Sequence, residues 1–333
     1  MSIISFPPEW HPQDWLWIGF PHAAEEWLGG LEAARVQIAA FASAVAESGQ
    51  EVRLLVRDAA NEALARRLVS AKVRLERCVY GDIWLRDTGP LVLLDGAGGR
   101  IARRFGFNGW GGKYEMPGDE TIGAQLAREA GLEVLVSDWI LEGGAVDGDG
   151  TGLAVTTGQC LLNPNRNPGL SRGDIEARLA RDLGFERVLW LGRGLLNDHT
   201  DGHVDNLARF TAPGVLALPA ASGSDDPNAA IYADACARAQ AFGLTVRNVP
   251  SPGLLLREGR IEPASYMNFA ITTHLVVVPT FGVARDAEGV AAVAALFPDR
   301  QTIGLPAAAV LAGGGGFHCA SQQMPSAQKV PPS

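Results

Sequence analysis

Short apolar runs and amphipathic segments alternate along most of the chain. Apolar residues at helical spacing predict helices at 31–48, near 58–70, and at 119–131, 171–184, 226–243 and 286–296. Short apolar runs predict strands at 14–20, 51–56, 72–80, 187–192 and 274–282, and a hairpin at 143–157 whose Asp-Gly pairs supply the turn. This alternation indicates an α/β fold.

Five polar, turn-rich strings interrupt the pattern, at 81–90, 141–150, 197–206, 263–269 and 313–325. One marker from each string recurs with a spacing of roughly 60 residues, in the set Asp87, Glu142, Asp205, Asn268 and Cys319. Such a period predicts about five structural units, each of which contributes one loop to a common centre. The units do not resemble one another in sequence, so the spacing alone leaves the architecture open.

Nothing in the composition divides the 333 residues into separate parts. No linker, low-complexity run or block of charge marks a boundary, and 47% of the residues are hydrophobic, enough for a sizeable core. We therefore expect a single domain over 1–333, with only a tail at about 326–333 loosely ordered.

Charge and hydropathy exclude several classes of partner. The net charge of −9 disfavours nucleic acid and anionic lipid and mildly favours a cationic ligand. No apolar run approaches the roughly 18 residues that span a bilayer, and the first residues lack the basic and apolar regions of a secretory signal. Four cysteines lie far apart without CxxC spacing, which argues for reduced thiols in the cytoplasm rather than a disulfide framework or a zinc knuckle. The oligomeric state stays open, and a homo-oligomer is compatible with the sequence.

Cys319 differs in its setting from the other cysteines. Three of them lie within strand or helix patterns and are typical packing thiols: Cys78, Cys160 and Cys236. Cys319 follows four glycines at 313–316, where a substrate could reach the sulfur, and is a candidate nucleophile. Adjacent side chains on extended backbone point apart, so His318 cannot easily be its base. We expect the distant His203 in that role.

His203 and Asp205 are two residues apart in the string "GHVDN". If "HVDNLARF" is a strand, both side chains point to one face, and a carboxylate beside an imidazole favours proton transfer. The alternative is a solvated hairpin edge with two outward polar side chains.

Two more carboxylates stand in the polar strings. Asp87 in "WLRDTGP" follows Trp84, and a carboxylate beside an aromatic wall suits a guanidinium or ammonium group. The alternatives are an Asp bonded to its own turn amides or neutralised by Arg86. Glu142 precedes two glycines that let backbone pass close by, although an ordinary turn is favoured there.

A metal site is the alternative chemistry, with candidate ligands His199, His203, Asp205, His318 and Cys319. Gly202 breaks the helix that would place His199 and His203 on one face, so we favour the nucleophile.

Taken together, seven strings resemble the agmatine deiminase branch of the bacterial peptidylarginine-deiminase-like family, within the guanidino-group-modifying superfamily. They are "DIWLRDTGP", "GFNGWGGKY", "LEGG", "LLNPNRNPG", "NDHTDGHVDN", "SYMNF" and "GGGGFHCASQQMP". The resemblance runs nearly end to end. It implies one catalytic domain, a fivefold pseudosymmetric α/β propeller of ββαβ units around a central pocket.

The resemblance also implies chemistry and roles. Cys319 matches the nucleophile, His203 the general acid/base, Asp87 and Asp205 the carboxylates that grip the guanidinium, and Glu142 the acidic residue that supports the histidine. The implied reaction converts agmatine, a small cationic guanidine, to N-carbamoylputrescine and ammonia in putrescine biosynthesis, without a metal or organic cofactor. For the far-end amine we expect Asp82, Trp84 and Trp110 as the receptor.

The exact substrate stays open at this point. Free or peptidyl arginine, or another small guanidine, is an alternative substrate. A non-catalytic or metal-bound guanidine-binding protein is the alternative from another class.

Overall fold

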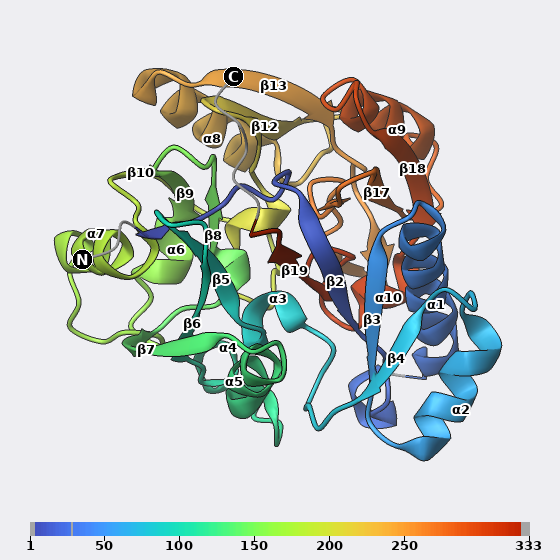
Figure 1. Cartoon of the computed structure of the whole chain (residues 1–333). Helices are drawn as coiled ribbons and strands as arrows, with labels where there is room; N and C mark the ends of the chain where they lie inside the picture. The colour runs from blue at the N-terminus through green and yellow to red at the C-terminus, as the bar shows by residue number, and fades with distance from the viewer. Residues whose placement is uncertain (1–3, 28, 328–333) are drawn as a thin grey trace.

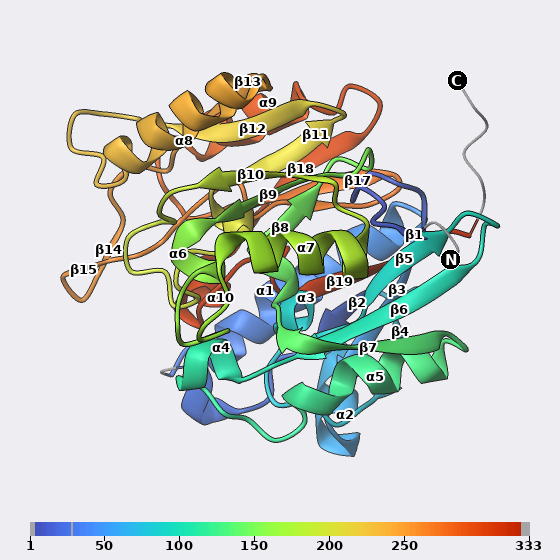
Figure 2. The same cartoon turned by 90° about the vertical axis from the view of Figure 1, so that its left-hand side faces the viewer.

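Most of the chain is built into five sheets of three or four strands (Figures 1 and 2). The structure is a computed structural model, and it describes residues 4–27 and 29–327. Each sheet repeats one pattern: two antiparallel strands are followed by a helix and by a further strand parallel to the second. The coarse expectation of an α/β fold is therefore confirmed.

The sheets follow one another along the chain. The first contains β19 (Ser321–Pro325), β2 (Gln13–Gly19), β3 (Glu51–Val56) and β4 (Arg74–Arg77), with α1 (Leu31–Glu47) and α2 (Ala59–Leu68). The second contains β1 (Ile4–Ser5), β5 (Leu91–Asp95), β6 (Arg100–Gly106) and β7 (Glu133–Ile140), with α4 (Gly109–Gly112) and α5 (Asp119–Glu129). The third contains β8 (Val146–Gly148), β9 (Leu153–Thr157) and β10 (Arg187–Leu191), with α6 (Gly158–Leu161) and α7 (Arg172–Leu183).

The remaining elements complete the pattern. The fourth sheet contains β11 (Arg209–Ala212), β12 (Val215–Ala220) and β13 (Thr245–Pro250), with α8 (Ala229–Phe242). The fifth contains β16 (Ala270–Ile271), β17 (Leu275–Thr280) and β18 (Gln301–Pro306), with α9 (Asp286–Ala294). A small hairpin pairs β14 (Leu256–Arg257) with β15 (Arg260–Ile261). Short helical turns are η1 (Ala24–Trp27), α3 (Leu85–Thr88), η2 (Gly143–Ala145), η3 (Val204–Asn206) and α10 (Ala308–Ala312). Figure 1 shows the long helices on the outside of the molecule and β19 near its middle.

The C-terminal end of the described chain returns to the first sheet. β19 pairs antiparallel with β2, in a register that places Ser321 opposite Ile18. Ser326, which we expected in the loose tail, donates its backbone N–H to Pro12 and its hydroxyl to Asp14. Residues 328–333 of that expected tail lie outside the described residues.

The local expectations hold for most elements, with two corrections. The helix expected at 171–184 is α7, which Ser171 caps in a reciprocal capping box with Asp174. The strand expected at 72–80 is only β4. Neither alternative for "HVDNLARF" is correct: η3 begins at Val204 and the strand β11 starts only at Arg209, and His203 and Asp205 are buried rather than solvated.

The connections between successive sheets carry the chemically interesting side chains. They link β4 to β5, β7 to β8, β10 to β11, the fourth sheet to β16, and β18 to β19. In that order they contain Asp87, Glu142, the pair His203 and Asp205, Asn268, and Cys319. No helix in the described ranges is long and apolar enough to cross a membrane.

Two helical glycines, one in tight contact and one in open space, test how closely the helices pack in this fold. A Cβ at Gly289 in α9 would lie 2.4 Å from ring atoms of Tyr266, whereas a Cβ at Gly173 in α7 would meet nothing closer than 3.9 Å. We expect Gly289→Ala to lower the free energy of unfolding by about 1–3 kcal/mol through overpacking. Gly173→Ala should raise it by up to about 1 kcal/mol through helix propensity. Urea denaturation of both variants checks the pair, and equal stabilities would contradict the packing.

Candidate active site

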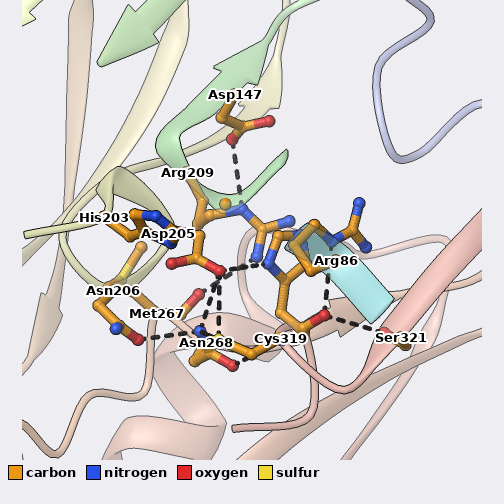
Figure 3. A network of polar contacts seen from close by, with 12 residues as sticks. Arg86, Asp147, His203, Asp205, Asn206, Arg209, Met267, Asn268, Cys319 and Ser321 are labelled. Carbon is orange, nitrogen blue, oxygen red and sulfur yellow. Dashed lines mark hydrogen bonds and ion pairs between the residues drawn. The ribbon is translucent and has the colours of Figure 1, made fainter. Parts of the chain in front are cut away.

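Cys319 is held between two polar side chains from other connections. Its Sγ accepts a hydrogen bond from Asn268 Nδ2 at 3.0 Å and donates to Asp205 Oδ2 at 3.4 Å. Its backbone N–H donates to Asn268 Oδ1 at 3.2 Å. In Figure 3 the labelled side chains of His203, Asp205, Asn268 and Cys319 lie together. The residue is only 5% exposed, yet it lines a cavity of about 270 Å³.

The glycines before Cys319 serve close packing rather than leaving the thiol unshielded. A Cβ at Gly316 would lie 2.4 Å from Oδ1 of Asn268. Only a glycine at position 316 lets the Asn268 amide approach the backbone this closely. From that place the amide binds both the backbone N–H and the sulfur of Cys319.

Four of the predicted site residues converge around Gly144. A Cβ at Gly144 would lie 2.7 Å from His203 Nδ1, 2.9 Å from Asp87 Oδ1 and 3.1 Å from Asp205 Oδ2. His203 Nδ1 is 3.6 Å from Asp87 Oδ1, and His203 Nε2 is 4.0 Å from Glu142 Oε2. The structure therefore brings groups from three connections to one point, although η3 rather than a strand presents His203 and Asp205.

Two donors fix the carboxylate of Asp87. The backbone N–H of Gly144 donates to Oδ1 and Trp110 Nε1 donates to Oδ2, each at 2.9 Å. The neighbouring Arg86 instead donates through Nη1 to the side chains of Gln322 and Gln323. Arg86 is thus turned to the last strand and makes no described ion pair with Asp87.

Several buried polar atoms of the site have no hydrogen-bond partner among the described residues. They are Asp205 Oδ1, Glu142 Oε2 and both ring nitrogens of His203. Buried polar atoms are normally satisfied, so this arrangement is incomplete as a protein interior. The unpaired carboxylate oxygens suit a ligand that brings several N–H donors.

The pKa values follow from burial and charge. Burial, then the carboxylates of Asp205 and Asp87, raise the pKa of the Cys319 thiol well above its usual value. Burial also raises the pKa of Asp87, partly offset by His203. For Asp205 burial opposes ionisation, but the hydrogen bond and charge of His318 together with the charges of His203 and Arg209 lower the pKa. Burial likewise opposes the charge on His203, but Asp87, Cys160 and Glu142 together raise the pKa of His203 well above its usual value. These shifts favour a protonated imidazole beside a thiol that is not ionised.

The cavity over Cys319 contains all three expected far-end residues, Asp82, Trp84 and Trp110. Glu25 and Glu26 of η1 and the stacked pair of Tyr114 and His199 also line it. Burial raises the pKa of Asp82 to about 7, and Asp119 adds to the effect. Aromatic walls and carboxylates together suit an elongated organic cation.

The alternative metal set does not assemble. Among the described residues, the ligand atoms that gather within 4.8 Å belong to Glu142, Cys160 and His203. Arg166 donates to Glu142 Oε1 at 2.7 Å, and this guanidinium disfavours a second cation there.

Comparison with known proteins decides the family. A model of the Porphyromonas-type peptidyl-arginine deiminase family matches residues 5–325. The chain belongs to this deiminase family. An agmatine deiminase of Pseudomonas aeruginosa (strain LESB58) is 33% identical over 354 residues, covering 97% of this chain and 96% of that protein.

Solved structures of family members have the same fold. Agmatine deiminase of Enterococcus faecalis, described as catalysing its reaction, superposes with a TM-score of 0.92 at 29% identity, covering 98% of this chain and 97% of that one. A cysteine-to-serine variant of C. jejuni agmatine deiminase with substrate bound gives a TM-score of 0.91 at 28% identity, covering 97% of each chain.

Two residues of this deiminase-family site were not assigned a role from the sequence. Asn268 entered only as the marker of its string, yet it binds Cys319 directly. His318 was set aside as a base for its neighbour, and its ring instead contacts Asp205 at 2.8 Å. The recurrence of the strings pointed to Asn268, whereas no local pattern pointed to this contact of His318.

The charge around the thiol leads to a measurable prediction. Because Asp87 raises the pKa of Cys319, Asp87→Asn should lower that pKa and speed alkylation by iodoacetamide at pH 8 about threefold. Glu26→Gln alters a carboxylate that lines the same cavity but is not among the main groups that raise the thiol pKa, so it is the matched control, with an unchanged rate. Mass spectrometry of the Cys319 peptide measures both rates. A rate that Asp87→Asn leaves unchanged would contradict the electrostatic assignment.

Proposed function

We propose that the chain hydrolyses agmatine to N-carbamoylputrescine and ammonia through a covalent intermediate on Cys319. The observation that carries the proposal is one thiol placed beside Asp205, with Asp87 and His203 close by, at the end of one cavity. Relatives of this chain that are named agmatine deiminase support the choice of substrate.

Binding depends on charge complementarity. A guanidinium has planar N–H donors that pair with carboxylate oxygens. Asp87 is already oriented by Trp110 and Gly144, and Asp205 Oδ1 is free of other donors among the described residues. Held between them, the planar cation presents its carbon to the sulfur from one face.

Entry of the cation also prepares the nucleophile. The carboxylates that raise the pKa of the Cys319 thiol are neutralised by the substrate. The bound positive charge therefore favours release of the thiol proton to solvent, and the thiolate forms next to the guanidinium carbon.

Proton transfers then follow from the protonated His203. The thiolate attacks the guanidinium carbon to form a C–S bond, His203 gives its proton to the departing nitrogen, and ammonia leaves behind an S-alkylthiouronium on Cys319. A water molecule loses a proton to the same imidazole and attacks that carbon. The C–S bond then breaks, the hydroxyl proton of the adduct passes to the departing sulfur as the C=O bond forms, the thiol is restored, and the ureido product leaves. Glu142 and Asp87 stabilise the imidazolium from two sides.

The far end of the substrate extends along the cavity. Trp84 and Trp110 provide apolar walls for the four-carbon chain, and Asp82 is the receptor for the ammonium group. Free arginine carries an extra carboxylate, which the acidic lining of Glu25, Glu26 and Asp82 would repel.

The five sheets support a finer proposal for the architecture. We infer a fivefold pseudosymmetric α/β propeller in one catalytic domain, because each sheet repeats the same strand, strand, helix, strand order and each connection supplies one part of the site. β19 returns to the first sheet and supplies its antiparallel strand.

A thiol variant tests the reaction directly. Cys319→Ser should lower ammonia release from agmatine by about 10³-fold or more, since a hydroxyl is a far weaker nucleophile here. Cys236→Ser, on helix α8 away from the cavity, is the matched control and should keep full turnover. Turnover by Cys319→Ser at the wild-type rate would exclude the mechanism. Faster release from arginine or from short arginine peptides than from agmatine would instead reassign the substrate, and binding without ammonia release would indicate a binding protein.

The proposed amine receptor, Asp82, predicts that KM for agmatine depends on pH. Because the pKa of Asp82 is about 7, its carboxylate is protonated below that pH and ionised above it. The KM for agmatine should fall several-fold as the pH rises from about 6 to 8, as the charge that attracts ammonium appears. In Asp82→Asn this change should vanish and KM should rise about tenfold.

A substrate that lacks the amine supplies the comparison. Butylguanidine cannot pair with Asp82, so its KM should be the same for the wild type and for Asp82→Asn. An equal loss with both substrates would show that Asp82 acts on the fold of the site instead.

A further inference from the structure

Glu9 brings a carboxylate from the N-terminal segment into the interior behind the site. It lies ahead of β2 in the chain and is buried. Its Oε1 accepts the backbone N–H of Ile271 at 2.8 Å. Its Oε2 pairs with Arg209 Nη2 and lies 2.9 Å from His318 Nε2. None of these contacts belongs to the reaction described above.

His318 spans two carboxylates with its two ring nitrogens. Nε2 faces Glu9 at 2.9 Å and Nδ1 faces Asp205 Oδ2 at 2.8 Å. Burial opposes both charges, but Arg209 and His318 lower the pKa of Glu9, and His318 lowers the pKa of Asp205. Ionised carboxylates only accept hydrogen bonds, so both contacts are made when each nitrogen carries a proton.

The orientation of Asp205 depends on this ring. His318 holds Oδ2, the same oxygen that is 3.4 Å from Cys319 Sγ and 3.3 Å from Asn268 Nδ2. The other oxygen, Oδ1, is left unpaired among the described residues and is free for a ligand. A ring with one anchored nitrogen can turn about its bond, whereas a ring anchored at both ends cannot.

We propose that Glu9 is a positioning residue of the reaction, which by its bond to His318 Nε2 fixes the ring that holds Asp205 toward the guanidinium. This inference rests on the proposed function for the part played by Asp205. Glu9 touches neither the cavity nor Cys319, so its effect passes through His318.

The test is a double-variant cycle on kcat/KM for ammonia release. Glu9→Gln and His318→Phe should each lower kcat/KM about tenfold or more, because a misplacement of about 1 Å in the reacting geometry costs on the order of 10²-fold. In the double variant, Glu9→Gln should add nothing to the loss caused by His318→Phe. Independent, multiplying losses in the double variant would overturn the inference.

A matched control separates positioning from support of the buried arginine. Asp147 also pairs with Arg209, through Oδ2 at 3.3 Å to Nε, as Figure 3 shows, but has no described hydrogen bond to His318. Asp147→Asn should lower the urea midpoint as Glu9→Gln does, yet leave kcat/KM within about threefold of wild type. If Asp147→Asn lowers kcat/KM as far as Glu9→Gln, the effect comes from Arg209 and the inference is wrong.

A variant with a shorter acidic side chain separates loss of positioning from loss of folding. Glu9→Asp keeps a buried negative charge near Arg209, whose charge acts over a distance, but withdraws the carboxylate by one methylene and so lengthens the short-range hydrogen bond to His318. It should fold and still show the loss in kcat/KM, and a folded Glu9→Asp with wild-type kcat/KM would contradict the proposal.

A readout without substrate keeps this inference distinct from the proposed function. The apparent pKa for iodoacetamide alkylation of Cys319 should shift in Glu9→Gln and in His318→Phe by equal amounts of about half a unit or more, with no further shift in the double variant. That result in a protein that releases no ammonia would refute the proposed function and uphold the role of Glu9. Normal turnover with separate, additive alkylation shifts would do the reverse.

Discussion

The site depends on one constraint: its buried carboxylates outnumber the positive charges that the protein places beside them. Asp87, Asp205 and Glu142 are buried around His203 and the thiol of Cys319. An interior of low dielectric tolerates such charges only with donors or cations beside them. Trp110, Gly144, His318 and Arg166 supply part of that compensation, and several oxygen and nitrogen atoms are left over. A planar cation with several N–H groups completes what the protein leaves open.

The fold holds these charges in place by keeping the regular elements and the reactive side chains in different parts of the chain. Regular strands and outer helices form the five sheets, whereas each reactive side chain stands on a connection between sheets. Rigid elements on both sides of a short connection restrict how far its side chain can move. The buried carboxylates can therefore be held close together. Their mutual repulsion costs free energy, and the packing of the five sheets offsets that cost.

Much of this organisation was readable from the sequence, and the rest was not for definable reasons. Helical periodicity located α1, α5, α7, α8 and α9 closely, because their apolar faces repeat with the helix. The polar strings marked the connections, because the glycine and acidic residues in them interrupt both the helical and the strand repeat of apolar residues. The geometry of η3 was missed because two polar residues at spacing two fit a strand as well as a tight turn. The link from Glu9 through His318 to Asp205 joins residues that are 309 and 113 positions apart, and no local pattern encodes such contacts.

The pairing of β19 with β2 has a consequence for how the protein comes into being. Cys319 precedes by two residues the strand that binds the N-terminal part of the first sheet. Because both are among the last parts of the chain to be synthesised, a chain that stops before residue 319 lacks the sulfur and the partner strand of β2. The nucleophile is therefore the last of these chemical groups to be added, and the same segment that adds it completes the first sheet.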